Sequence, residues 1–154
     1  MKSLLLWQRK NKLTDSKLEI GSFPFLIKKG KMYIMIVTST SGKSWILPKG
    51  HPEDELSNHQ VAVLETYEEA GVKSIIFDRK LRKEFKDKEG GKFIVYPLLI
   101  KKCLDDNDWP EESKRERRLV SINKALSLVT KQEHLQAIKY FSSNSIRSKL
   151  FKAI

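Results

Sequence analysis

The chain of 154 residues carries a formal net charge of +11, and 40% of its residues are hydrophobic while 32% are charged. This length fits one domain, and the apolar fraction excludes a chain that is disordered throughout. A single cysteine, Cys103, excludes an internal disulfide framework and a cysteine zinc site, which favours a reducing compartment. The apolar run over residues 4–7 is too short for a signal peptide or a membrane span, so we expect a cytoplasmic protein without a membrane partner.

In chain order, the pattern mixes strands with helices. Apolar and β-branched runs predict strands over residues 20–27, 32–38, 45–47, 72–77, 81–85, 92–101 and 115–120. Apolar residues at helical spacing predict helices over residues 57–70, 122–129 and 130–141. We therefore expect one domain of the α/β or α+β class over residues 19–141, between a basic lead-in (1–18) and a basic tail (142–154) whose order the sequence leaves open.

The first expected helix has signals at both ends. Ser57 and Gln60 have the spacing of a capping box, and Gly71 stands where a helix favours a C-terminal glycine. Its apolar stripe is expected to consist of Val61, Leu64 and Tyr67.

Other local patterns concern single residues. Pro24 within the first strand predicts an edge strand or a bulge. Thr130 and Glu133 have the spacing of a second capping box. We interpret His134 as a surface residue of the last helix and Cys103 as a buried thiol.

Acidic residues are concentrated in the first helix and the loop before it. Between Lys49 and Lys73 there are six acids and no lysine or arginine. Glu65, Glu68 and Glu69 stand at i, i+3 and i+4, which places them on one helical face. Like charges at this spacing destabilise a helix by roughly 0.2–0.5 kcal/mol per pair. A divalent cation is the simplest compensation, and a solvated helix face is the alternative.

The same window resembles the Nudix box, the signature of hydrolases that act on a nucleoside diphosphate linked to another moiety. The family pattern runs glycine, five residues, glutamate, seven residues, then Arg-Glu-apolar-x-Glu-Glu-x-Gly-apolar. Gly50 takes the opening position, the three glutamates take the Glu-x-x-Glu-Glu core, and Gly71-Val72 close the pattern without a gap. The resemblance covers about residues 19–141 and implies an α/β/α sandwich, with a mixed sheet between helices.

Three positions depart from the family pattern. Leu56 replaces the first glutamate, Leu64 replaces the arginine, and Thr66 stands at the apolar position after Glu65. In the family the arginine pairs with the motif carboxylates and orients them, which Leu64 is unable to do. The alternative to an active enzyme is therefore a Nudix fold that binds a nucleotide or RNA and has weak turnover or none.

The resemblance implies hydrolysis of a phosphoanhydride bond with Mg²⁺ or Mn²⁺ as cofactor. It implies that Glu65 and Glu69 are metal ligands and that Glu68 is either a third ligand or the general base, with Glu65 and Glu68 as the catalytic candidates. A backbone carbonyl at Lys49 or Gly50 is expected to add a ligand.

The flanking residues are similar to the branch that hydrolyses diphosphoinositol polyphosphates and diadenosine polyphosphates. In that branch, polar and basic residues like Ser39, Lys43 and Lys49 help to hold phosphates. Arg115 and Arg117, after a Trp-Pro-Glu segment, are similar to a second element there, and a charged, exposed strand edge is the alternative.

The expected partner is a polyanionic small molecule, which the net charge of +11 favours. An RNA 5′-pyrophosphohydrolase is the alternative within the enzyme class, because a basic surface also binds a phosphate backbone.

Overall fold

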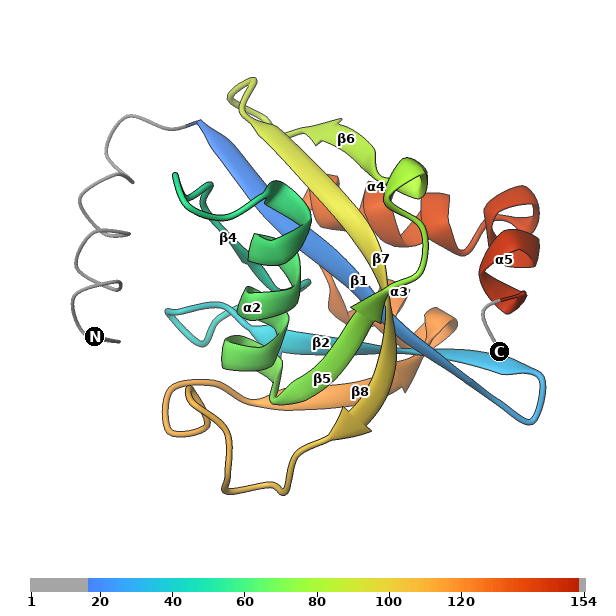
Figure 1. Cartoon of the computed structure of the whole chain (residues 1–154), viewed down its shortest axis with the longest axis horizontal. Helices are drawn as coiled ribbons and strands as arrows, with labels where there is room; N and C mark the ends of the chain where they lie inside the picture. Colours follow the sequence, from blue (N-terminus) through green and yellow to red (C-terminus); the bar gives the residue numbers. More distant parts are fainter. Residues whose placement is uncertain (1–16, 153–154) are drawn as a thin grey trace.

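The computed structural model describes residues 17–152, so most of the expected lead-in lies outside the described residues. The strands are β1 (Leu18–Lys28), β2 (Lys31–Thr38), β3 (Trp45–Ile46), β4 (Lys49–Gly50), β5 (Val72–Ile76), β6 (Lys83–Lys86), β7 (Lys92–Cys103) and β8 (Arg117–Ser121). The helices are α2 (Asn58–Ala70), α3 (Ile122–Leu128), α4 (Gln132–Phe141) and α5 (Asn144–Phe151), with a 3₁₀ turn η1 at Arg79–Leu81 (Figure 1).

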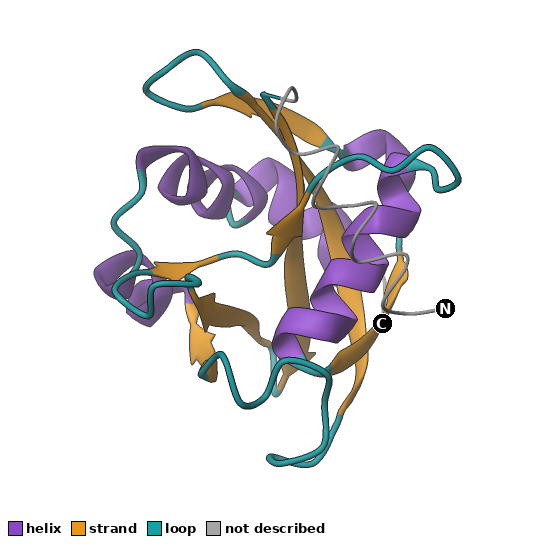
Figure 2. Cartoon of the chain, turned by 90° about the vertical axis from the view of Figure 1, so that its left-hand side faces the viewer, coloured by secondary structure: helices purple, strands orange, loops and turns teal. Residues whose placement is uncertain are grey.

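The described strands form one eight-stranded mixed sheet with the central order β3-β2-β1-β7-β5. Strands β1 and β7 run parallel, whereas the other named pairs are antiparallel. Helix α2 covers one face of the sheet, and α4 with its neighbours covers the other (Figures 1 and 2). The expected α/β/α sandwich is confirmed. Among the described helices, none is long and apolar enough to cross a bilayer.

Strand β2 is buried on both faces, as its continuous apolar sequence predicts. Ile34 and Ile36 belong to the large apolar cluster shared with the C-terminal helices. Met35 and Val37 belong to a second cluster that includes Ala70 of α2. The strand therefore supports both layers.

The prediction of an edge strand or a bulge at Pro24 is wrong, because β1 lies in the middle of the sheet and its register with β7 runs through Pro24 without a shift. The backbone nitrogens of Ser22 and Pro24 point to the same side of β1. On that side Ser22 donates to the Pro48 carbonyl (3.0 Å), and pairing with β2 begins at Phe25. Proline is accommodated because its missing N–H falls between these two pairings.

The C-terminal segment differs from the sequence expectation in two ways. The cap of α4 is Lys131, without a side-chain hydrogen bond, so the capping box expected at Thr130 is wrong. Val129 forms a bridge with Trp45, which keeps the chain extended just before the helix. The segment after Phe141 forms α5, whose apolar side chains pack into the large cluster (Figure 1).

The predictions for Cys103 and His134 are both wrong, because the thiol is exposed and the imidazole is buried. Cys103 is exposed at the end of β7. His134 is 1% exposed, lies against the Phe93 ring, and accepts a hydrogen bond from the Leu47 N–H at Nδ1 (3.0 Å). That bond places the ring proton on Nε2. Burial is the main cause that lowers the pKa of His134 to about 3, and the nearby lysines Lys49 and Lys131 add to it.

Acidification is expected to destabilise the protein through His134. Between its folded pKa of about 3 and the ordinary value of 6.5, the unfolded chain binds a proton that the folded chain does not. The contribution of this group is therefore complete above pH 6.5 and is lost progressively as the pH falls, by about 2 kcal/mol at pH 5. Urea unfolding at pH 7 and pH 5 measures this loss.

The variant His134→Gln keeps an acceptor for the Leu47 N–H but does not titrate, so it should lose less stability than the wild type between pH 7 and pH 5. The control His59→Gln removes a partly exposed imidazole and should behave like the wild type. Parallel pH dependence in His134→Gln and the wild type would contradict the assignment.

Candidate active site

Helix α2 begins and ends where the sequence predicts. The Ser57 side chain accepts from the Gln60 N–H, and the Gln60 side chain accepts from the Ser57 N–H, so the capping box is confirmed. Gly71 has a positive φ of 64°, which glycine adopts without strain. These ends fix where the helix begins and stops between β4 and β5.

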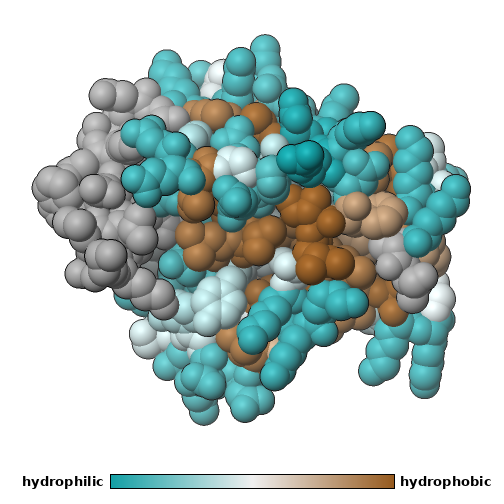
Figure 3. All heavy atoms as spheres, viewed as in Figure 1, coloured by the Kyte–Doolittle hydropathy of each residue, from teal (hydrophilic) through white to brown (hydrophobic). Residues whose placement is uncertain are grey.

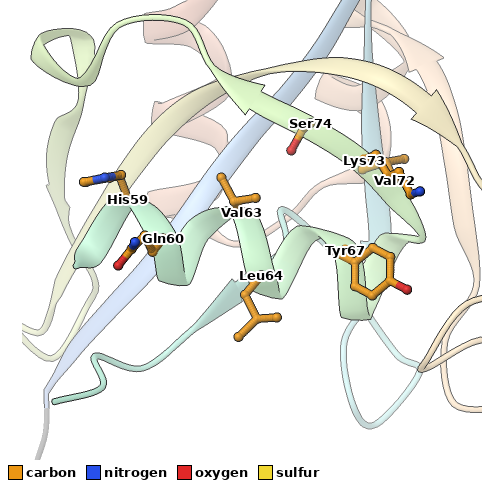
Figure 4. A pocket seen from close by; sticks show the side chains of 8 residues that line it. All are labelled: His59, Gln60, Val63, Leu64, Tyr67, Val72, Lys73 and Ser74. Carbon is orange, nitrogen blue, oxygen red and sulfur yellow. The ribbon is translucent and has the colours of Figure 1, made fainter. Parts of the chain in front are cut away.

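The predicted apolar stripe of α2 is correct only at Val61. Leu64 and Tyr67 lie on the outer side of the helix, where they line a groove of about 420 Å³ beside β5 (Figure 4). Apolar side chains gather over this part of the surface (Figure 3). The buried face consists of Val61, Ala62, Glu65, Thr66, Glu68, Glu69 and Ala70. The helix therefore buries acids and shows apolar side chains, opposite to an ordinary surface helix.

All three glutamates are buried. Glu65, Glu68 and Glu69 are 6%, 8% and 3% exposed. Acidic side chains are almost never this buried unless they are paired or bind a cation. The alternative of a solvated helix face is therefore wrong.

Gly50 allows one of these carboxylates to lie directly against the backbone. Its strand β4 pairs with β1, where Gly50 stands opposite Ile20. A Cβ atom at Gly50 would lie 2.4 Å from the Cδ atom of Glu65, so any other residue would displace that carboxylate. The opening glycine of the motif is thus required by close packing.

Glu69 is held on both oxygens. Its Oε1 accepts from the Lys49 N–H (3.2 Å), and its Oε2 lies 3.6 Å from Nη2 of Arg115. Burial raises the pKa of Glu69 to about 8, and the Glu111 carboxylate adds to the rise. The Arg115 guanidinium and the Lys49 N–H oppose it without cancelling it. A further positive charge at this carboxylate would favour its ionised form.

Thr66 occupies the motif position that is usually apolar. It is fully buried, and its hydroxyl donates to the Ala62 carbonyl (2.7 Å). Its Oγ1 lies 2.6 Å from the Oγ of Ser22 in β1, so the Ser22 hydroxyl donates to it. This bond joins α2 to β1 in the middle of the buried face.

The expected phosphate-binding residues lie in two places. Lys49 forms an ion pair with Glu19, a partner that sequence reasoning missed. Lys43 is exposed in the loop between β2 and β3. In the same loop the Ser39 Oγ lies 3.1 Å from the Ser41 Oγ and accepts from the Ser44 N–H. Their contact with phosphate stays a prediction.

The end of the β7–β8 connection and the first residue of β8 bring two arginines to α2. The side chains of Arg115 and Arg117 are each 10% exposed, so the alternative of an exposed strand edge is wrong for both. Arg117 stacks over Trp109 at 4.1 Å and donates to the carbonyls of Ala70 (3.1 Å) and Gly71 (3.0 Å). It thereby caps the C-terminus of α2, where a positive charge is favourable.

The donors at this site fit a hard divalent cation. Carboxylate oxygens are preferred ligands of Mg²⁺, and burial raises the pKa of Glu69 although Arg115 and the Lys49 N–H oppose that rise. Within residues 17–152, no group of three acidic, histidine or cysteine side chains is arranged to hold a metal by itself. Mg²⁺ usually takes only one or two carboxylates together with water and substrate phosphate, so such a cage is not required.

Known proteins resemble this chain in sequence and in fold. Nudix hydrolase 21, chloroplastic, from Arabidopsis thaliana is 29% identical over 129 residues, which cover 79% of this chain and 64% of that protein. Nudix hydrolase 16, mitochondrial, from the same organism is 32% identical over 130 residues, which cover 72% of this chain and 71% of that protein. This chain thus spans less than two thirds of the first relative. No family model matches.

A solved structure of a C. elegans Ap4A hydrolase in a binary complex has the same fold, with a TM-score of 0.62 at 19% identity. The alignment covers 89% of this chain and 98% of that structure. The chain belongs to the Nudix hydrolase family, because it is 32% identical to Nudix hydrolase 16 over 71% of that protein and carries the motif glutamates on α2.

The bond between α2 and β1 gives a stability prediction. Thr66→Val should destabilise the protein by about 1–3 kcal/mol, because the buried Ser22 hydroxyl loses its acceptor. The double variant Ser22→Ala with Thr66→Val should recover most of that loss, since both polar groups are gone. Chemical unfolding of the four proteins measures the coupling. Additive effects of the two substitutions would contradict it.

Proposed function

We propose that this protein is a metal-dependent pyrophosphohydrolase that cleaves a phosphoanhydride bond in a highly phosphorylated small molecule. The observation that supports this most is the burial of three glutamates on the face of α2 that packs against Gly50. Burying three carboxylates costs free energy, and a reaction that uses a bound cation explains why they lie together on this face.

In this proposal Glu65 and Glu69 hold Mg²⁺ or Mn²⁺, together with a carbonyl of Lys49 or Gly50. When bound, the cation neutralises phosphoryl oxygens and lowers the pKa of a coordinated water. Glu68 either adds a third ligand or accepts the proton of the attacking water. Water forms the new P–O bond as the anhydride P–O bond breaks, and two phosphorylated products leave.

The proposed substrates are dinucleoside polyphosphates such as diadenosine polyphosphates, or diphosphoinositol polyphosphates. Lys43 and Ser39 are proposed to contact their phosphates from the loop before β3. The chain's net charge of +11 suits such polyanions. The C. elegans protein of the same fold is an Ap4A hydrolase, which is consistent with this class of substrate.

The variant Glu69→Gln tests the enzyme proposal directly. Purified protein with Mg²⁺ or Mn²⁺ should release phosphorylated products from at least one member of a panel of dinucleoside and diphosphoinositol polyphosphates, measured by chromatography. Glu69→Gln keeps the side-chain shape but removes the charge, so kcat should fall roughly 100-fold or more, as loss of several kcal/mol of metal stabilisation requires.

The matched control is Glu84→Gln, an exposed glutamate in β6, which should retain wild-type kcat. The enzyme proposal fails if the wild-type protein releases no product from any pyrophosphate substrate with either metal. Unchanged turnover in Glu69→Gln would overturn the role of that carboxylate alone.

A second candidate function is nucleotide or RNA binding without turnover, which Leu64 at the arginine position favours. A 5′-triphosphate RNA in the same assay separates the possibilities. Product release from RNA identifies an RNA 5′-pyrophosphohydrolase. Steeply salt-dependent RNA binding without product supports a binding module.

A further inference from the structure

Helix α2 contains neither lysine nor arginine, although the family pattern has an arginine at position 64. Leu64 lines the outer groove with Val63 and Tyr67 (Figure 4), whereas Glu69 lies on the buried face. Any side-chain cation that holds Glu69 therefore has to come from another element.

Arg115 comes from the segment that joins β7 to β8, and three groups hold its guanidinium. Its Nε donates to Oε1 of Glu111 (2.7 Å), its Nη1 donates to the Thr38 carbonyl (2.8 Å), and its Nη2 lies 3.6 Å from Oε2 of Glu69. These partners belong to its own loop, the end of β2, and α2. A planar guanidinium anchored by two hydrogen bonds has a fixed direction, which a lysine would not provide.

The loop that carries Arg115 is itself fixed to α2. The Glu111 N–H donates to the Glu68 carbonyl (3.0 Å), and the Arg115 N–H donates to the Glu111 carbonyl (3.1 Å). Glu69 is therefore oriented from two sides, because its Oε1 accepts from the Lys49 N–H while Arg115 faces Oε2. One oxygen of this buried carboxylate is thus positioned by β4, and the other by the segment before β8.

We infer that Arg115 takes over the positioning role of the missing motif arginine, with Glu111 holding Arg115 in place. It acts through Glu69 and is a positioning residue. This inference rests on the proposed function, since it explains how the glutamates stay oriented although position 64 is leucine.

The test measures Mn²⁺ binding without substrate, by electron paramagnetic resonance, and then kcat with Mn²⁺ at saturation. Arg115→Met keeps an apolar stem but removes the guanidinium, so the Kd for Mn²⁺ should rise about 10–100-fold, as loss of a partner of a metal ligand does. The kcat should fall by a similar factor. Leu64→Arg should change kcat less than about twofold, because the position of Glu69 is already set.

Arg117→Met is the matched control, because it removes an equally buried arginine two residues away. It should lower the Tm, since the carbonyls at the end of α2 lose their donor, but it should leave the Kd for Mn²⁺ unchanged. Thermal unfolding of both variants is measured to check that they are folded.

The outcomes separate the two proposals. If the wild type binds Mn²⁺ and turns over but Arg115→Met has the same Kd or a lower one, Arg115 is only a neighbouring or competing charge and the inference is overturned. A large gain of kcat in Leu64→Arg would also overturn it. If the wild type neither binds Mn²⁺ nor hydrolyses any substrate, the proposed function fails and this inference fails with it.

Discussion

The structure depends on the burial of three glutamates between α2 and the sheet. Burying carboxylates is costly, and the neighbouring elements reduce that cost. Gly50 leaves room for Glu65, and the Lys49 N–H and the Arg115 guanidinium contact Glu69. These contacts do not fully offset the effect of burial, which raises the pKa of Glu69 to about 8. We propose that a bound cation, in addition to the chain's own side chains, compensates this carboxylate.

Local patterns in the sequence predict the central part of this site well. The capping box, the C-terminal glycine and the spacing of the glutamates depend on residues a few positions apart, and all of them are as predicted. The continuous apolar run of β2 likewise predicts burial on both faces. The family resemblance rests on a longer spacing. Gly50 and Gly71 stand at the first and the last glycine of the family pattern, with the glutamates between them.

Tertiary context explains what sequence reasoning missed. Helical periodicity gives the spacing of α2 but not which side faces the sheet, so the predicted apolar stripe includes Leu64 although Leu64 lies on the outer side. The partnership of Arg115 with Glu69 joins residues 46 positions apart and depends on where β8 lies. Burial of His134 and tolerance of Pro24 in a central strand also depend on neighbours that no local pattern identifies.

The most direct test of the central claim is to map by NMR which amide signals of the protein are broadened by Mn²⁺. The account predicts selective broadening at Lys49–Gly50 and in the C-terminal half of α2. The amides of α5 (Asn144–Phe151), which packs into the cluster of the C-terminal helices and lies at the far right of Figure 1, away from α2, should keep their intensity. Broadening centred on another region, or none at these residues, would contradict a cation site at the buried glutamates.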